Sequence, residues 1–238
     1  MTMTQEVPTP QPITFDLLLR VFTDPKFIDQ TREIVRISDE EFIESGFSVY
    51  KDLFSDDYHI YEIFKGSQDG YSMDNEENVY DPLKDPLLNK QNHYCPIIEI
   101  HCHDEGRITP SPFEDGKGDL YAWNMSRRTG ANEYRFDNRG IDIICARAKQ
   151  SRLIKLFLVQ ATNPVQLNEG LLEQVCEQIY GKGYCERDDL SEQEAKERFN
   201  KTNVYRAELM TLSEKGFSRR ELERLRQFEY SPGRLIKL

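Results

Sequence analysis

The chain has 238 residues, of which 31% are charged and 38% hydrophobic, and its formal net charge is −11. This length and composition are typical of a soluble protein with one sizeable domain. The negative charge argues against nucleic acid or an anionic membrane as the main partner, and no apolar run approaches the ~20 residues that span a bilayer. The five cysteines are scattered and odd in number, which favours reduced thiols and a cytoplasmic location over a disulfide framework.

The first part of the chain predicts helices. Residues 1–12 are polar and proline-rich, and we expect a disordered lead-in there. A short apolar segment follows over 13–21, and residues 24–25, Asp-Pro, form a helix-start pattern with an N-cap and a proline at the first helical position. A second helical piece is predicted over 38–43, because Ser and Glu three residues apart form a capping-box pattern.

Alternating apolar and polar residues then predict strands over 47–50 and 58–64. Residues 66–92 are rich in glycine, asparagine and acids, which is typical of a long loop or an insertion. An apolar strand over 96–102 comes next. Two further strands, over 141–146 and 153–159, are separated by a short polar link, which favours an antiparallel hairpin.

The C-terminal third is richer in helix formers, and we predict helices over 168–180, 191–214 and 218–229. The predicted fold class is therefore α+β. Residues 13–163 form a domain built on a mixed sheet, and residues 164–238 form a helical extension that packs on this domain or binds a partner. The sequence shows neither a regular βαβ alternation nor a glycine-rich phosphate loop.

Two of the four histidines, His101 and His103, stand at the end of the predicted strand 96–102. Residues i and i+2 of a strand point to the same face, so the two imidazoles can converge on one metal ion. Neutral imidazole is a good zinc ligand, and a catalytic zinc usually has three protein ligands and a water. Cys102 faces the other side and is predicted to be a buried thiol without a chemical role.

A carboxylate is the natural third ligand, and Glu114, Asp115 and Asp119 all follow shortly downstream. The run from Ser111 to Glu114, Ser-Pro-Phe-Glu, is a capping-box arrangement with proline at the first helical position. This places Glu114 or Asp115 on the first turn of a helix, with Ser111 able to point the same way.

A metal that activates water also needs a general base or acid within reach. Glu44 stands out, because it lies at a predicted helix end, two residues before Gly46 and directly before a strand. A carboxylate at such a junction can reach the end of a neighbouring strand.

These residues together resemble the motif of the JAMM (also called MPN-plus or JAB) zinc metalloproteases: Glu-x-Gly before a strand, a distant His-x-His at a strand end, then Pro-Ser and a nearby acid. In that family two histidines and an aspartate bind zinc, the glutamate is the general acid/base, and the serine stabilises the oxyanion. The resemblance implies that His101 and His103 bind zinc, Glu44 transfers the proton, and Ser111 donates to the oxyanion.

The chain departs from the family pattern in two places. Asp104 stands where a proline usually follows the second histidine, and Glu114 stands where the family has its aspartate. Asp115 is one residue later. Asp119 and Leu120 look like the family's Asp-Leu, displaced by an inserted Glu-Asp-Gly-Lys-Gly. We therefore rank Asp115 first as the third ligand, with Asp119 and then Glu114 as alternatives.

The resemblance covers roughly residues 25–160 and implies a JAB/MPN-like, cytidine-deaminase-like mixed sheet flanked by helices. It implies a zinc-dependent peptidase or isopeptidase with a protein or peptide substrate, a ubiquitin-like conjugate being one candidate. The alternative is a non-catalytic scaffold or binding module of the same fold. A barrel of repeated βα units with a His-x-His site is disfavoured, because the repeats are missing and only His59 and His93 remain as further ligands.

Overall fold

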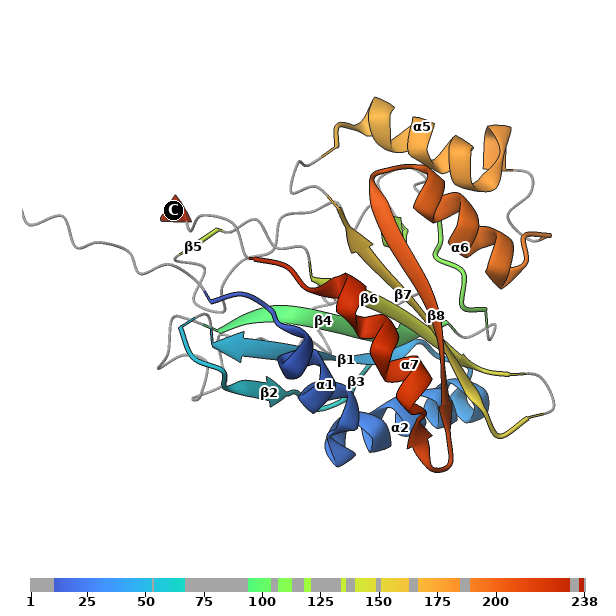
Figure 1. Cartoon of the computed structure of the whole chain (residues 1–238). Helices are drawn as coiled ribbons and strands as arrows, with labels where there is room; N and C mark the ends of the chain where they lie inside the picture. The colour runs from blue at the N-terminus through green and yellow to red at the C-terminus, as the bar shows by residue number, and fades with distance from the viewer. Residues whose placement is uncertain are drawn as a thin grey trace, which may run out of the picture.

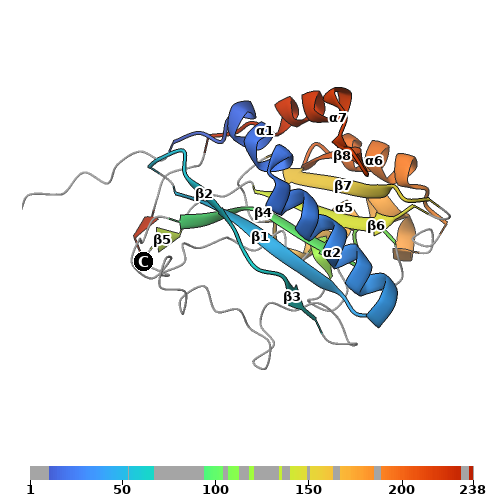
Figure 2. The ribbon, with the colours of Figure 1, turned by 90° about the horizontal axis from the view of Figure 1, so that it is seen from below.

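The computed structural model describes residues 11–52, 54–66, 94–103, 107–112, 118–120, 134–135, 140–148, 151–162, 167–184, 189–231 and 236–237. Within these ranges eight strands form one mixed sheet, in the order β2-β1-β4-β6-β7-β8-β9 with β3 beside β1. Helices cover both faces of this sheet (Figures 1 and 2). None of the helices described is both long and apolar enough to cross a membrane. The predicted α+β class is confirmed.

The helix α2 (Pro25–Glu41) begins where the Asp-Pro pattern predicts, and the carboxylate of Asp24 accepts a hydrogen bond from its first turn. The prediction of a separate helix from Ser38 is wrong, because α2 runs through that residue without a break. The Ser38 hydroxyl, which would cap the second helix, instead donates to the backbone carbonyl of His103. The helix ends at Phe42, whose φ of 55° is left-handed.

The strands of the main sheet are β1 (Ser45–Asp52), β2 (Tyr58–Ile60), β3 (Phe64–Lys65), β4 (Tyr94–Cys102), β6 (Ile141–Arg147), β7 (Ile154–Ala161), β8 (Tyr205–Ser213) and β9 (Gly216–Phe217). β1 and β4 pair antiparallel, and β4 and β6 pair parallel. The predicted hairpin is confirmed, because β6 and β7 pair antiparallel. The single strand predicted over 58–64 is divided into β2 and β3, which both pair with β1.

The remaining elements are α1 (Phe15–Thr23), β5 (Tyr134–Arg135), α5 (Glu169–Tyr180), η2 (Lys182–Tyr184), α6 (Glu192–Lys201), α7 (Arg219–Glu223), η3 (Arg224–Phe228) and β10 (Ile236–Lys237). The helix predicted over 168–180 is confirmed as α5. The helix predicted over 191–214 is correct for α6 but wrong for β8, which pairs antiparallel with β7. The C-terminal third therefore contributes a strand to the sheet that holds the histidines.

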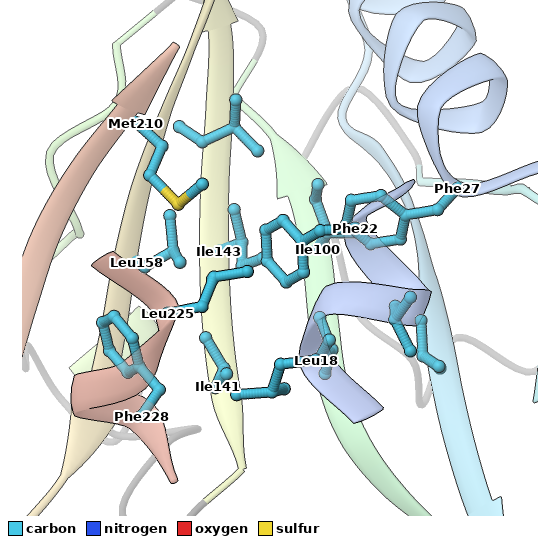
Figure 3. Packing of buried hydrophobic residues seen from close by; sticks show 14 of the residues in the cluster. Leu18, Phe22, Phe27, Ile100, Ile141, Ile143, Leu158, Met210, Leu225 and Phe228 are labelled. Atoms are coloured by element: carbon cyan, nitrogen blue, oxygen red, sulfur yellow. The ribbon is translucent and has the colours of Figure 1, made fainter. Parts of the chain in front are cut away.

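Each face of the sheet has its own hydrophobic core. The first core lies between the sheet and the helices α1, α2 and η3 (Figure 3), where Phe22, Ile100 and Leu225 are fully or almost fully buried. The second core lies on the opposite face, where α5 and α6 pack over Ile144 and Phe157. The two helical layers thus fix which way each alternate side chain of β4 points.

Side chains protect the outer edge of β8 where β9 does not reach. The carboxamide of Asn200 donates to the carbonyl oxygen of Ala207 and accepts from its N–H, both at 3.0 Å, as a neighbouring strand would. Further along the strand, the guanidinium of Arg224 donates to the carbonyl oxygen of Leu209. Blocking an edge in this way prevents pairing with another chain.

Candidate metal centre

β4 carries the two histidines to one end of the sheet. Ile100 and Cys102 point into the first core, so the alternation of the strand turns His101 to the opposite face. The residue beside His101 on the parallel strand β6 is Ile144, which belongs to the second core. His103 follows the last residue of β4 and points the same way, since its ring meets that of His101.

Three donor side chains converge there. Nε2 of His101 lies 3.2 Å from Nε2 of His103. The carboxylate of Asp119 places Oδ1 at 3.2 Å from Nε2 of His101 and Oδ2 at 3.3 Å from Nε2 of His103. Ligands at about 2.0–2.1 Å from a tetrahedral ion lie about 3.3–3.4 Å from one another, so this spacing fits a single ion. Among the residues that the structure describes, this is the one cluster of histidine and acid side chains with metal-ligand spacing.

The three side chains are nearly buried without being sealed. They expose 9% (His101), 11% (His103) and 13% (Asp119) of their surface. A catalytic metal site has three protein ligands and keeps a fourth position for water or substrate. The arrangement is therefore compatible with a metal that meets solvent or a substrate.

Asp119 is held by Ser111. The backbone N–H and the hydroxyl of Ser111 donate to Oδ2 of Asp119 at 2.6 and 2.8 Å, and the same hydroxyl accepts from the Asp119 N–H at 2.8 Å. Gly118, just before the aspartate, has a φ of +95°, and a Cβ there would lie 2.1 Å from the carbonyl oxygen of Pro112. Only glycine fits this position, so the backbone that precedes the ligand is closely constrained.

The charges of the site suit metal binding. Burial would raise the pKa of Asp119, but the adjacent imidazoles of His103 and His101 outweigh burial and hold this pKa well below its usual range. Burial lowers the pKa of His103, whereas Asp119 and then Glu44 raise it, and the net result lies above the usual value. Because a metal ligand must be deprotonated, the carboxylate is ready to bind, while a metal competes with the proton that the raised pKa of His103 favours.

Glu44, the predicted acid/base, lies beside the site. Ser45 pairs with Cys102 across the antiparallel strands β1 and β4, so Glu44 stands one step further along, opposite His103. Its negative charge is near enough to raise the pKa of His103. Gly46, the partner of His101 in the same ladder, adds no side chain next to that imidazole. The Glu44 carboxylate is therefore next to the three donor side chains but is not one of the candidate metal ligands.

Two supporting residues escaped the sequence prediction. Ser38 of α2 donates to the carbonyl oxygen of His103 at 2.9 Å. Tyr180, the last residue of α5, is buried, and its hydroxyl donates to the carbonyl oxygen of Pro110 at 2.6 Å. Both contacts join segments that are far apart in the sequence, and no local spacing marks them. They fix the backbone on either side of the loop between the histidines and the serine.

The structure brings together five of the predicted site residues: His101, His103, Asp119, Ser111 and Glu44. Of the three carboxylates considered as the third ligand, Asp119 is the one that the structure places beside both histidines. The first-ranked and third-ranked choices, Asp115 and Glu114, lie outside the described residues. The roles of Ser111 as oxyanion donor and of Glu44 as acid/base stay predictions.

Comparisons of the chain with protein-family models, curated proteins and solved structures found no match. The resemblance to the JAMM family therefore stays a prediction drawn from the motif. The class that the fold and the site define is an α+β protein with a candidate metal centre of two histidines and one aspartate.

Proposed function

We propose that this protein is a zinc-dependent hydrolase of amide bonds, a peptidase or isopeptidase of the JAMM type with a JAB/MPN-like fold. The observation that carries the proposal is the converging set of His101, His103 and Asp119, with inter-ligand distances of 3.2–3.3 Å. Two imidazoles and one carboxylate suit zinc, and three protein ligands leave the fourth position that a catalytic zinc needs.

Zinc held by these residues would act as a Lewis acid on a carbonyl oxygen and would lower the pKa of water. Glu44, which adjoins His103, would accept a proton from the attacking water and donate it to the leaving amine. The Ser111 hydroxyl is bonded to the carboxylate of Asp119, so its first task is to orient that ligand. For the same hydroxyl to donate to an oxyanion, it must give up this bond.

The resemblance, and no feature of the structure, suggests the substrate: a protein or peptide, with a ubiquitin-like conjugate as one candidate. The C-terminal residues after 163, proposed above to bind a partner, supply the α5 and α6 wall of the second core. Their exposed side is therefore the part that remains available for a partner.

Zinc content tests the metal centre. We expect about one zinc per chain in protein purified without chelators, measured by mass spectrometry of the element. His101→Ala, His103→Ala and Asp119→Ala should each abolish this stoichiometry. His59→Ala is the matched control, because His59 lies on β2 and makes an edge-on ring contact with Tyr61, away from the three donors. Wild-type protein that stays metal-free when zinc is supplied would refute the proposal.

Hydrolysis tests the role of Glu44. On ubiquitin-like conjugates and on a peptide library, we expect Glu44→Gln to keep zinc and to lower kcat by about 10²–10⁴-fold, the usual contribution of a general acid/base. Glu41→Gln is the matched control, because Glu41 is an exposed acid three residues earlier that pairs with Lys65. Zinc bound at full occupancy with no hydrolysis of any amide would instead favour the non-catalytic scaffold.

A further inference from the structure

Two cysteines face each other beneath the metal centre. Cys102 on β4 and Cys145 on β6 are direct partners in the parallel ladder. Their Sγ atoms are 3.0 Å apart, and both thiols are free and fully or almost fully buried in the first core. Nothing in the proposed hydrolysis uses either thiol.

The backbone beneath this pair suits a disulfide. Neighbouring strands of a sheet lie about 4.8 Å apart, which falls within the Cα–Cα range of about 4.4–6.8 Å that disulfides span. The sulfur atoms need to approach by about 1 Å to reach the S–S bond length of about 2.05 Å. Side-chain rotation with a small shift of one strand end achieves this, and β4 ends at Cys102.

We propose that Cys102 and Cys145 form a thiol–disulfide couple that closes under two-electron oxidation by hydrogen peroxide and thereby weakens metal binding. In the first step the O–O bond of the oxidant breaks, one sulfur becomes a sulfenic acid and one water leaves. In the second step the other thiol attacks this sulfur, the S–S bond forms and a second water leaves. The two thiols lose two electrons and two protons in total, and hydrogen peroxide accepts them all.

The proposed effect of the disulfide on metal binding follows from the position of Cys102 in the chain. Cys102 lies between the two histidine ligands, so a movement of its backbone toward β6 also moves His101 and His103. Metal ligands tolerate deviations of only about 0.2 Å in bond length. Closing the disulfide therefore changes the distances on which the single-ion fit depends. The disulfide itself does not rest on the proposed hydrolysis, whereas its effect on the metal rests on the three donors binding an ion.

Peptide mapping tests the disulfide. Metal-free wild-type protein is treated with hydrogen peroxide, denatured, alkylated and digested. Both thiols are buried, so peroxide reaches them slowly and the treatment should extend over hours. We expect a linked Cys102–Cys145 peptide that dithiothreitol separates. The Cys176→Ser variant, which lacks a third buried thiol of the second core, should give the same linked peptide. Recovery of Cys102 and Cys145 as alkylated single peptides would overturn the proposal.

Zinc titration tests the consequence. We expect the oxidised wild-type protein to bind zinc at least about tenfold more weakly than the reduced protein, in line with changes in the surroundings of metal ligands, and dithiothreitol to restore the affinity. Cys145→Ala, checked for folding by circular dichroism, should bind zinc equally with and without peroxide. A linked peptide with unchanged zinc affinity would refute the coupling. Reduced protein without zinc affinity would refute the metal centre while leaving the mapped disulfide intact.

Discussion

Replacing Ser111 by alanine separates two roles of its hydroxyl. In the structure this hydroxyl donates to Oδ2 of Asp119 and accepts from the N–H of Asp119, both at 2.8 Å. If its task is to orient the ligand, Ser111→Ala must weaken metal binding. If its task is to stabilise an oxyanion, the variant must lose turnover and keep its metal.

The magnitude follows from the bonds that are lost. Ser111→Ala removes both hydroxyl bonds and retains the backbone N–H bond to Oδ2 at 2.6 Å. A hydrogen bond to a charged group contributes about 1.5–3 kcal/mol, and a neutral one about 1 kcal/mol. Because the metal-free protein loses the same bonds, only part of this sum appears as a change in binding. We expect about 1.4–2.7 kcal/mol, which is a 10- to 100-fold rise in the zinc Kd.

Competition titration against a chromophoric chelator measures this change. Ser191→Ala is a matched control, because Ser191 makes the same pair of bonds with the carboxylate and N–H of Glu194 at the start of α6. The control should lose about 1 kcal/mol of stability, as helix caps do, and keep the wild-type Kd for zinc. A wild-type Kd in Ser111→Ala would refute the orienting role, and lost turnover at that Kd would favour the oxyanion role.

Three further predictions concern the fold around the site. Gly118→Ala should lower the free energy of unfolding, measured by urea denaturation, by roughly 1–3 kcal/mol, because the added Cβ meets the Pro112 carbonyl oxygen. The variant should also bind zinc more weakly. Wild-type values for both quantities would contradict the strain argument. Glu208→Gln should lose about 1–2 kcal/mol at pH 7, because Glu208 is almost buried and pairs with Lys196. The pKa of Glu208 in the folded protein is lowered. The stability difference between wild type and variant should therefore be full above the unfolded pKa of about 4.3 and vanish as pH falls through the folded pKa. Urea denaturation at several pH values that shows a constant difference would contradict this prediction. Asn200→Ala should lose about 1–2 kcal/mol and associate at high concentration, because it uncovers the edge of β8; sedimentation that shows monomers at every concentration would contradict the edge argument.

The central strands were predictable because they are buried and strongly apolar. The strand β4 and the hairpin of β6 and β7 agree with the predicted ranges to within two residues at each end. β8 was mistaken for helix because its sequence, Tyr-Arg-Ala-Glu-Leu-Met-Thr-Leu-Ser, is rich in helix formers. Pairing with β7 overrides that local preference. Asn203, left-handed at φ 58°, lies between the end of α6 at Lys201 and the start of β8, and an asparagine there was the available signal for a break.

The two histidines were predictable because the i, i+2 rule depends only on the strand that carries them. The candidate third ligand, Asp119, was not predictable by counting, because the number of residues in a loop does not measure the distance between its ends. Asp119 lies eight residues from Ser111, yet their side chains bond. Ser111 was predicted to cap a helix, and its hydroxyl does accept an N–H bond, though from Asp119. Gly118 directly before an acid was the local clue, since its left-handed φ supports the turn there.

The candidate metal centre depends on the C-terminal third, which the sequence predicted to be a helical extension. Ile108 and Leu120, which flank the segment holding the serine and the aspartate, are both buried in the second core together with side chains of α5 and α6. Tyr180 adds a buried hydrogen bond from the end of α5 to the Pro110 carbonyl. Burial of Ile108 and Leu120 against this helical wall therefore helps to order the segment that carries Asp119. The candidate ligands belong to the motif, whereas their positions also depend on helices far along the chain. The helix α6, for example, starts 81 residues after Ser111.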